Sequence, residues 1–192
     1  MEQARAEFIY LLQLAYSGEL GAARAYAGHR ASLRNPQERR SLGKILRDEL
    51  VHRHCILAML RELGSAPEPR RERKMNKVGR AISLFCFLGG WFFPMWGAGR
   101  LESQNIREYE HAARLAQVAG LSHFIDRLLE MAEVEWDHEL FFRTQAQRHW
   151  LWRWMPHWVI PPPREEIRTA FASFVASGSR EVERVHAPWI VR

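Results

Sequence analysis

The segment GELGAARAYAGH (18–29) sets one carboxylate, Glu19, among small residues on a helical face that is otherwise apolar. A charged side chain on a core face is costly unless it is paired, protonated or bound to a metal ion. The residues that face Glu19 therefore decide what this segment forms, and they have to be sought elsewhere in the chain.

Apolar residues recur at helical spacing in four segments of the chain, residues 8–33, 42–63, 101–118 and 122–142. Pro36, Gly64 and Gly120 follow the first three segments, and Ser122 is expected to cap the fourth. No segment alternates with period two, so no sheet is predicted. Two short turns and one long connection predict an all-α fold, a four-helix bundle with a crossover.

The crossover contains an uncharged stretch, AISLFCFLGGWFFPMWGAG (81–99). Its length approaches the ~20 residues of a membrane-spanning helix, but Gly89, Gly90 and Pro94 interrupt it. One interpretation is a helix that lies in one leaflet, with the basic run 69–77 on the lipid headgroups. A second interpretation is a crossover that packs on the bundle or in a homodimer interface, and a third is a true membrane span.

The domain organisation follows from this pattern. Residues 1–148 are expected to form the bundle, with the crossover at 65–100, and residues 149–192 a tail that packs on it. The tail begins with HWLWRWMPHW (149–158), continues through three prolines and contains a short helix at 164–175. Its tryptophans suit a second contact with a membrane interface or a cap on the bundle equally well.

Composition and charge narrow the classes of function. The only two cysteines, Cys55 and Cys86, are far apart in apolar surroundings, which predicts two buried thiols in a reducing compartment and no disulfide framework. The first residues do not resemble a cleaved signal peptide, so we expect a cytoplasmic protein, either free or peripheral on the inner face of the membrane. The net charge of +6 comes from arginines spread along the chain, and no nucleic acid partner is expected.

The pattern Glu-x-x-His occurs four times, at Glu49/His52, Glu108/His111, Glu135/His138 and Glu183/His186. About one match would arise by chance, so position on the helix has to decide. The first and third pairs lie inside apolar stripes, where isolated charges are disfavoured. The other two are interpreted as surface pairs.

An internal repeat supplies further acidic residues. ELGAARAY (19–26) aligns with ESQNIREY (102–109), which matches Glu19 to Glu102 and Tyr26 to Tyr109. Residues seven apart are separated by two helical turns and share one face. Each helix pair thus provides a lone Glu followed by Glu-x-x-His.

These residues form a candidate ligand set for metal ions. Four carboxylates and two imidazoles inside a bundle suit a pair of ions of moderate hardness, iron first and manganese second. The set is Glu19, Glu49, His52, Glu102, Glu135 and His138.

Over residues 15–145 the chain resembles the ferritin-like di-iron carboxylate proteins, and GELGAARAYAGH resembles the first-helix motif of the demethoxyubiquinone hydroxylases. The resemblance implies that the six residues named above are iron ligands and catalytic. It also implies that Glu49 and Glu135 bridge the ions, and that Tyr26 and Tyr109 orient carboxylates. The chain departs from the family at Glu108, where the family usually has a histidine.

Two functions are therefore expected, with a non-catalytic role as a third class. The first is a di-iron monooxygenase that uses O₂ and an unidentified electron donor to hydroxylate a hydrophobic, quinone-like substrate. The alternative is a rubrerythrin-like protein that reduces peroxide or oxidises iron, although two cysteines cannot form the Cys₄ iron site of rubrerythrins. Gly18 and Gly21 beside Glu19 leave either a slot for a small molecule or room for close helix packing.

Overall fold

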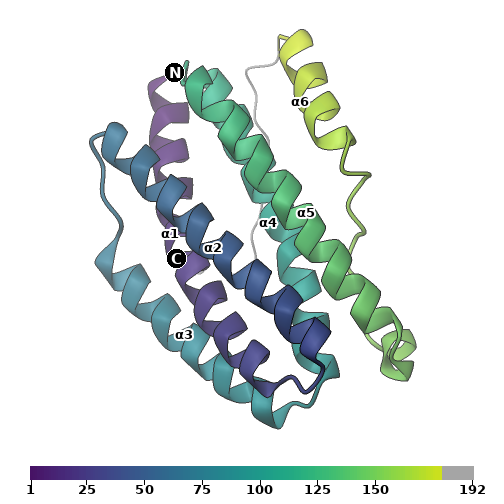
Figure 1. Cartoon of the computed structure of the whole chain (residues 1–192). Coiled ribbons are helices and arrows are strands. Elements are labelled where there is room, and N and C mark those ends of the chain that lie inside the picture. Colours follow the sequence, from purple (N-terminus) through teal and green to yellow (C-terminus); the bar gives the residue numbers. More distant parts are fainter. Residues whose placement is uncertain (179–192) are drawn as a thin grey trace. The chain divides into compact units, whose positions relative to one another are not determined.

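The structure is a computed structural model that describes residues 1–178. Helices and connecting turns make up this part of the chain, and it contains no strand (Figure 1). The helices are α1 Glu2–Ser32, α2 Pro36–Glu62, α3 Pro69–Leu88, α4 Phe92–Val118, α5 Ile125–Gln147 and α6 Glu166–Ala176, with 3₁₀ turns at Ser122–Phe124 and Trp150–Trp154. The prediction of an all-α fold is confirmed.

Two helix starts are fixed by side-chain caps. The Asn35 side chain accepts a hydrogen bond from the Gln37 amide at 2.8 Å, and Pro36 opens α2. Glu68 accepts bonds from the Arg70 and Arg71 amides at 2.9 and 2.6 Å and caps α3 in the same way. Both caps satisfy amides that have no partner within the helix.

The start of α5 differs from the prediction. Ser122 opens a 3₁₀ turn, and α5 begins only at Ile125. Neither the turn nor α5 has a side-chain cap hydrogen bond, so Ser122 is not the expected N-cap. The turn brings the Phe124 ring to 6.0 Å from the Phe8 ring, and burial of these two rings fixes the chain there instead.

The chain divides into two compact units. One comprises residues 12–97 and is called the 12–97 unit. Within the described residues, the other joins residues 1–11 to residues 98–178 and is called the 98–178 unit. Helices α1 and α4 each contribute residues to both units.

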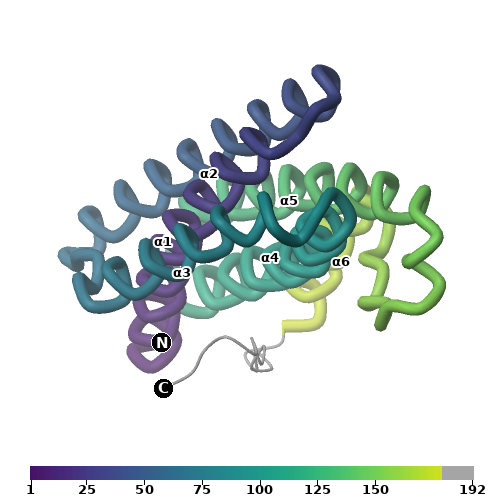
Figure 2. Tube along the Cα trace, turned by 90° about the horizontal axis from the view of Figure 1, so that it is seen from below, coloured from purple at the N-terminus to yellow at the C-terminus, as the bar shows by residue number. Residues whose placement is uncertain are grey.

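Within the 12–97 unit, α2 runs back along α1, and α3 packs against α1 (Figure 2). Glycines make the contact between α1 and α3 close. A Cβ at Gly79 would meet the Gly21 carbonyl oxygen and come to 2.7 Å from Arg24 Cβ, and a Cβ at Gly28 would meet Ser83. Close packing therefore explains Gly21, whereas a Cβ at Gly18 would meet no atom within 4 Å.

A substitution at Gly79 tests this packing. Gly79→Ala is expected to lower the free energy of unfolding by about 1–2 kcal/mol, because the added methyl group meets backbone atoms that have to move. In the matched change Gly18→Ala, the added methyl group enters open space beside α1. Helix propensity is then expected to raise the free energy of unfolding by up to about 1 kcal/mol. Urea denaturation of both variants measures the difference, and equal effects would contradict the close contact.

The first part of the crossover is a helix that the sequence analysis did not predict. The basic run 69–77 is helical and forms the first half of α3. The apolar run is split, because Gly90 takes a φ of 70° between α3 and α4. Pro94 lies in the first turn of α4, where its missing N–H costs no helical hydrogen bond.

The last turns of α3 carry large apolar side chains on the outside. Leu84, Phe85, Phe87 and Leu88 are between 50% and 78% exposed, and they are called the α3 apolar end. Gly79 and Cys86 lie on the opposite, buried side of the helix. Across the described residues, no helix combines the length and hydropathy that a transmembrane segment needs.

The two cysteines are free thiols. Cys86 is buried as predicted, and burial raises its pKa to about 11. Cys55 is only half-buried, because it lies at the edge of the buried stripe of α2, so the prediction of two buried thiols is wrong for it.

In the 98–178 unit, the segment after α5 packs back onto that helix. The Trp158 indole donates a hydrogen bond to Glu139 Oε1 at 2.8 Å and fills the space beside Gly99. Helix α6, predicted at 164–175, lies along α5, where Arg168 contacts Asp126 at 2.7 Å and Glu133 at 2.6 Å (Figure 1). These contacts favour the cap interpretation of the tryptophan segment, although Trp150 and Trp154 remain exposed.

Candidate metal centre

The first cluster of metal-ligating side chains lies between α1 and α2 in the 12–97 unit. Glu19 comes from α1, and Glu49 and His52 come from α2; these three residues are called the α1–α2 group. All three are buried, with exposed fractions of 4%, 0% and 3%. One ligand atom of each lies within 4.8 Å of the others, and His52 Nδ1 is 3.9 Å from Glu19 Oε1.

The local sequence explains why these polar residues are inside. Glu49 and His52 continue the buried stripe of α2 that begins at Leu42 and Ile45 and extends to Ile56. A spacing of three to four residues keeps the whole stripe on one face of the helix. The polar pair is therefore placed by the apolar residues before and after it.

Arg53, the neighbour of His52, ties three helices of this unit together. Its Nη1 donates to the Tyr16 carbonyl oxygen at 2.6 Å, and its guanidinium lies 3.7 Å from the centroid of the Tyr16 ring. Its Nη2 is 2.6 Å from Glu72 Oε1 of α3. These contacts fix the rotation of α2 and with it the direction of His52.

The second cluster lies between α4 and α5 in the 98–178 unit. Glu102 comes from α4, and Glu135 and His138 come from α5; these three residues are called the α4–α5 group. Their exposed fractions are 0%, 0% and 2%. One ligand atom of each again lies within 4.8 Å of the others, and His138 Nδ1 is 3.6 Å from Glu135 Oε2.

Sequence reasoning missed one residue of this second cluster, Asn105. Its Nδ2 donates a hydrogen bond to Glu102 Oε2 at 2.9 Å and a longer one to Glu135 Oε2 at 3.5 Å. Asn105 follows Glu102 by three residues, so the two side chains lie on the same face of α4. That spacing was a usable signal, because an amide beside a ligating carboxylate can hold it in one orientation.

The internal repeat is reproduced in the burial pattern. Glu19 and Tyr26 are both buried on α1, and their counterparts Glu102 and Tyr109 are both buried on α4. The shared face inferred from the seven-residue spacing is confirmed. The role of the two tyrosines in orienting carboxylates stays a prediction.

The donor set of each group fits a metal ion. Two carboxylates and one imidazole, buried together, are ligands that iron, manganese and zinc all accept. Asn105 adds the kind of hydrogen bond that metal sites use to fix a ligating carboxylate. The buried Glu/His residues are therefore compatible with a metal site, and the ligand types leave the identity of the ion open.

One of the two pairs interpreted as surface pairs is not on the surface. His111 is buried, with an exposed fraction of 6%, and burial lowers its pKa although Glu7 acts in the opposite direction. Glu108 is half-buried. The prediction fails for His111 because α4 is covered on more than one side, so a position turned away from Tyr109 is also inside. Glu183 and His186 lie outside the described residues.

A further buried histidine, His29, makes stability depend on pH. Burial lowers its pKa to about 4 from an unfolded value near 6.5, so protons bind preferentially to the unfolded chain. Between pH 6.5 and pH 4, the free energy of unfolding should therefore fall by up to about 1.4 kcal/mol for each pH unit because of His29.

Variants of His29 test this dependence. In urea denaturation at several pH values, His29→Gln should lose less stability between pH 6.5 and 4 than the unchanged protein. Parallel curves for His29→Gln and the unchanged protein would contradict the assignment.

Another buried carboxylate beside the second cluster, that of Glu139, accepts hydrogen bonds from other residues. Glu139 is fully buried next to His138 in the sequence, yet its oxygens accept hydrogen bonds from Arg143 at 2.9 and 3.1 Å and from Trp158 at 2.8 Å. The sequence analysis did not single it out. These contacts explain its burial without a metal ion.

Comparison with protein-family models, with characterised proteins and with solved structures finds no match to this chain. The resemblance to the ferritin-like di-iron proteins and the demethoxyubiquinone hydroxylases therefore rests on the motifs in the sequence alone.

Proposed function

We propose that the α1–α2 group and the α4–α5 group hold a pair of metal ions, iron before manganese, in a ferritin-like four-helix arrangement. The observation that carries the proposal is that the two groups have the same residue types in the same arrangement. Each consists of one Glu from one helix and a Glu-x-x-His pair from the next, and all six side chains are buried. One such group could serve a structural purpose, but two with the same donors favour a dinuclear centre.

The reaction that suits this ligand set best is hydroxylation of a hydrophobic, quinone-like substrate with O₂. An iron pair would supply O₂ activation, in which one oxygen atom enters the substrate and the other leaves as water, with two electrons and two protons from a reductant. The buried side chains of the two groups would serve as the metal ligands and exclude bulk water. Asn105 would keep Glu102 in one orientation.

Two observations support a small apolar substrate. A Cβ at Gly18, directly before Glu19, would meet no atom within 4 Å, so no neighbouring residue fills the space beside this part of α1. The α3 apolar end also gives this chain an exposed apolar surface of the kind that contacts lipids or apolar partners. A hydrophobic molecule delivered from a membrane surface fits both.

The proposal is tested with reduced, iron-loaded protein, O₂ and a panel of quinone precursors, followed by mass spectrometry in ¹⁸O₂. We expect one ¹⁸O atom in an organic product. Rapid removal of hydrogen peroxide or oxidation of free Fe²⁺ without a labelled product would contradict the hydroxylase and favour the rubrerythrin-like alternative. Failure to bind iron at all would contradict both.

A further inference from the structure

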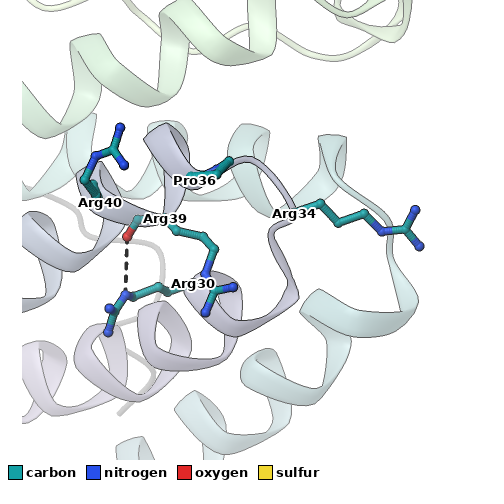
Figure 3. Close-up of a pocket in the computed structure, with 5 residues that line it drawn as sticks. All are labelled: Arg30, Arg34, Pro36, Arg39 and Arg40. Atoms are coloured by element: carbon teal, nitrogen blue, oxygen red, sulfur yellow. Dashed lines mark hydrogen bonds between the residues drawn. The ribbon is translucent and has the colours of Figure 1, made fainter.

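A pocket lined by arginines lies at the turn between α1 and α2 in the 12–97 unit. It has a volume of about 260 Å³, and its lining consists of Arg30, Arg34, Pro36, Arg39 and Arg40 (Figure 3). No carboxylate lines it within residues 1–178. Guanidinium groups offer several N–H donors in a planar fork that suits phosphate oxygens, so the pocket selects for an anion.

The fold builds this pocket through one close contact. Arg30 Nε donates to the Arg39 carbonyl oxygen at 3.3 Å. The Arg30 guanidinium lies over Gly43 of α2, where a Cβ would approach Arg30 Nε to 3.2 Å, so the glycine makes room for it. Arg34 and Arg40 extend outward on either side, which leaves their donors available to a ligand arriving from solvent (Figure 3).

The turn between α1 and α2, where the pocket lies, is at the same end of the 12–97 unit as the last turns of α3 (Figure 1). The Trp91 indole, which follows α3, donates to Glu38 Oε2 of the first turn of α2 at 2.9 Å. Ser83 of α3 lies against Gly28, two residues before Arg30. The exposed apolar side chains thus begin next to the cationic pocket.

We propose that this end of the unit docks on an anionic bilayer, with the phosphate of an acidic phospholipid in the arginine pocket and the α3 apolar end in the acyl region. A phospholipid combines an anionic phosphate with apolar acyl chains. The arginine pocket would bind the phosphate, and the α3 apolar end would contact the acyl chains. Free phosphate would occupy only the pocket and would leave the α3 apolar end exposed. A second copy of the chain carries the same cluster of arginines, so the two copies would repel each other at this surface. The proposal does not depend on the metal centre.

The experiment measures binding of the full-length protein to vesicles of phosphatidylcholine, alone or with 30% phosphatidylglycerol. We expect binding to the mixed vesicles and at least tenfold weaker binding to the neutral ones. Arg39→Glu/Arg40→Glu should weaken binding to the mixed vesicles at least about tenfold. The control Arg47→Glu/Arg61→Glu changes the net charge equally at exposed positions elsewhere on α2 and should have a much smaller effect.

A second pair of variants separates a lipid from a soluble anion. Phe87→Ser/Leu88→Ser changes exposed side chains only, and it should abolish vesicle binding while the pocket still binds the soluble headgroup glycerol phosphate. Equal binding to neutral and anionic vesicles would overturn the proposal. So would tight binding of inorganic phosphate without vesicle binding, or a dimer that Phe87→Ser/Leu88→Ser dissociates while vesicle binding is absent.

Discussion

Glu102→Ala is expected to remove most of the metal from the purified protein, with the affinity falling at least about tenfold. Glu102 is fully buried on α4, within 4.8 Å of ligand atoms of Glu135 and His138, and its carboxylate is held by Asn105 at 2.9 Å. The change removes a buried charged donor that no neighbouring residue replaces. Elemental analysis of protein purified in the presence of iron measures the loss.

The control for this prediction is Glu108→Ala on the same helix. Glu108 is half-buried and belongs to neither group, so its loss should leave the metal content unchanged. Circular dichroism of both variants, together with the isosteric Glu102→Gln, separates loss of a ligand from loss of the fold. Equal metal loss in Glu102→Ala and Glu108→Ala would contradict the assignment of the α4 ligand.

His138→Ala is expected to abolish O₂-dependent product formation while the helical fold persists. His138 is the only imidazole of the α4–α5 group, and it lies 3.6 Å from Glu135. Alanine at this position leaves a cavity, but it also removes the cost of burying a polar ring, so the net change in stability should be modest. Turnover under ¹⁸O₂ and thermal unfolding are measured on the same preparation.

The adjacent residue offers a matched control. Glu139→Gln keeps an acceptor for the Trp158 indole and loses only the ion pair with Arg143. We expect a slightly less stable protein that retains its metal and its turnover. Turnover that survives in His138→Ala, or that is lost equally in Glu139→Gln, would contradict the role given to His138.

The sequence was most informative where one pattern was long and regular. The stripe through Leu42, Glu49, His52 and Ile56 predicted both a helix and its buried polar pair, because a helix that buries one face has to bury whatever the stripe contains. The seven-residue spacing from Glu19 to Tyr26, matched at Glu102 and Tyr109, predicted the second cluster in the same way.

The sequence did not predict the features that depend on contacts between different helices. The helical character of the basic run in α3 depends on the Glu68 cap and on close packing at Gly79, and neither has a strong signal in composition. Burial of His111 depends on what covers the second side of α4. The arginine pocket depends on Gly43 making room for Arg30, a contact between residues thirteen positions apart that periodicity does not reveal.

The measurement that tests the central claim most directly is Mössbauer spectroscopy of the ⁵⁷Fe-loaded protein, combined with iron analysis. A shared centre predicts about two iron ions per chain and magnetic coupling between them in the oxidised state. Glu49→Ala and Glu135→Ala, which change one residue of each group, should each disturb both ions. One iron ion per chain, or two uncoupled ions that respond separately to these two changes, would contradict the dinuclear centre.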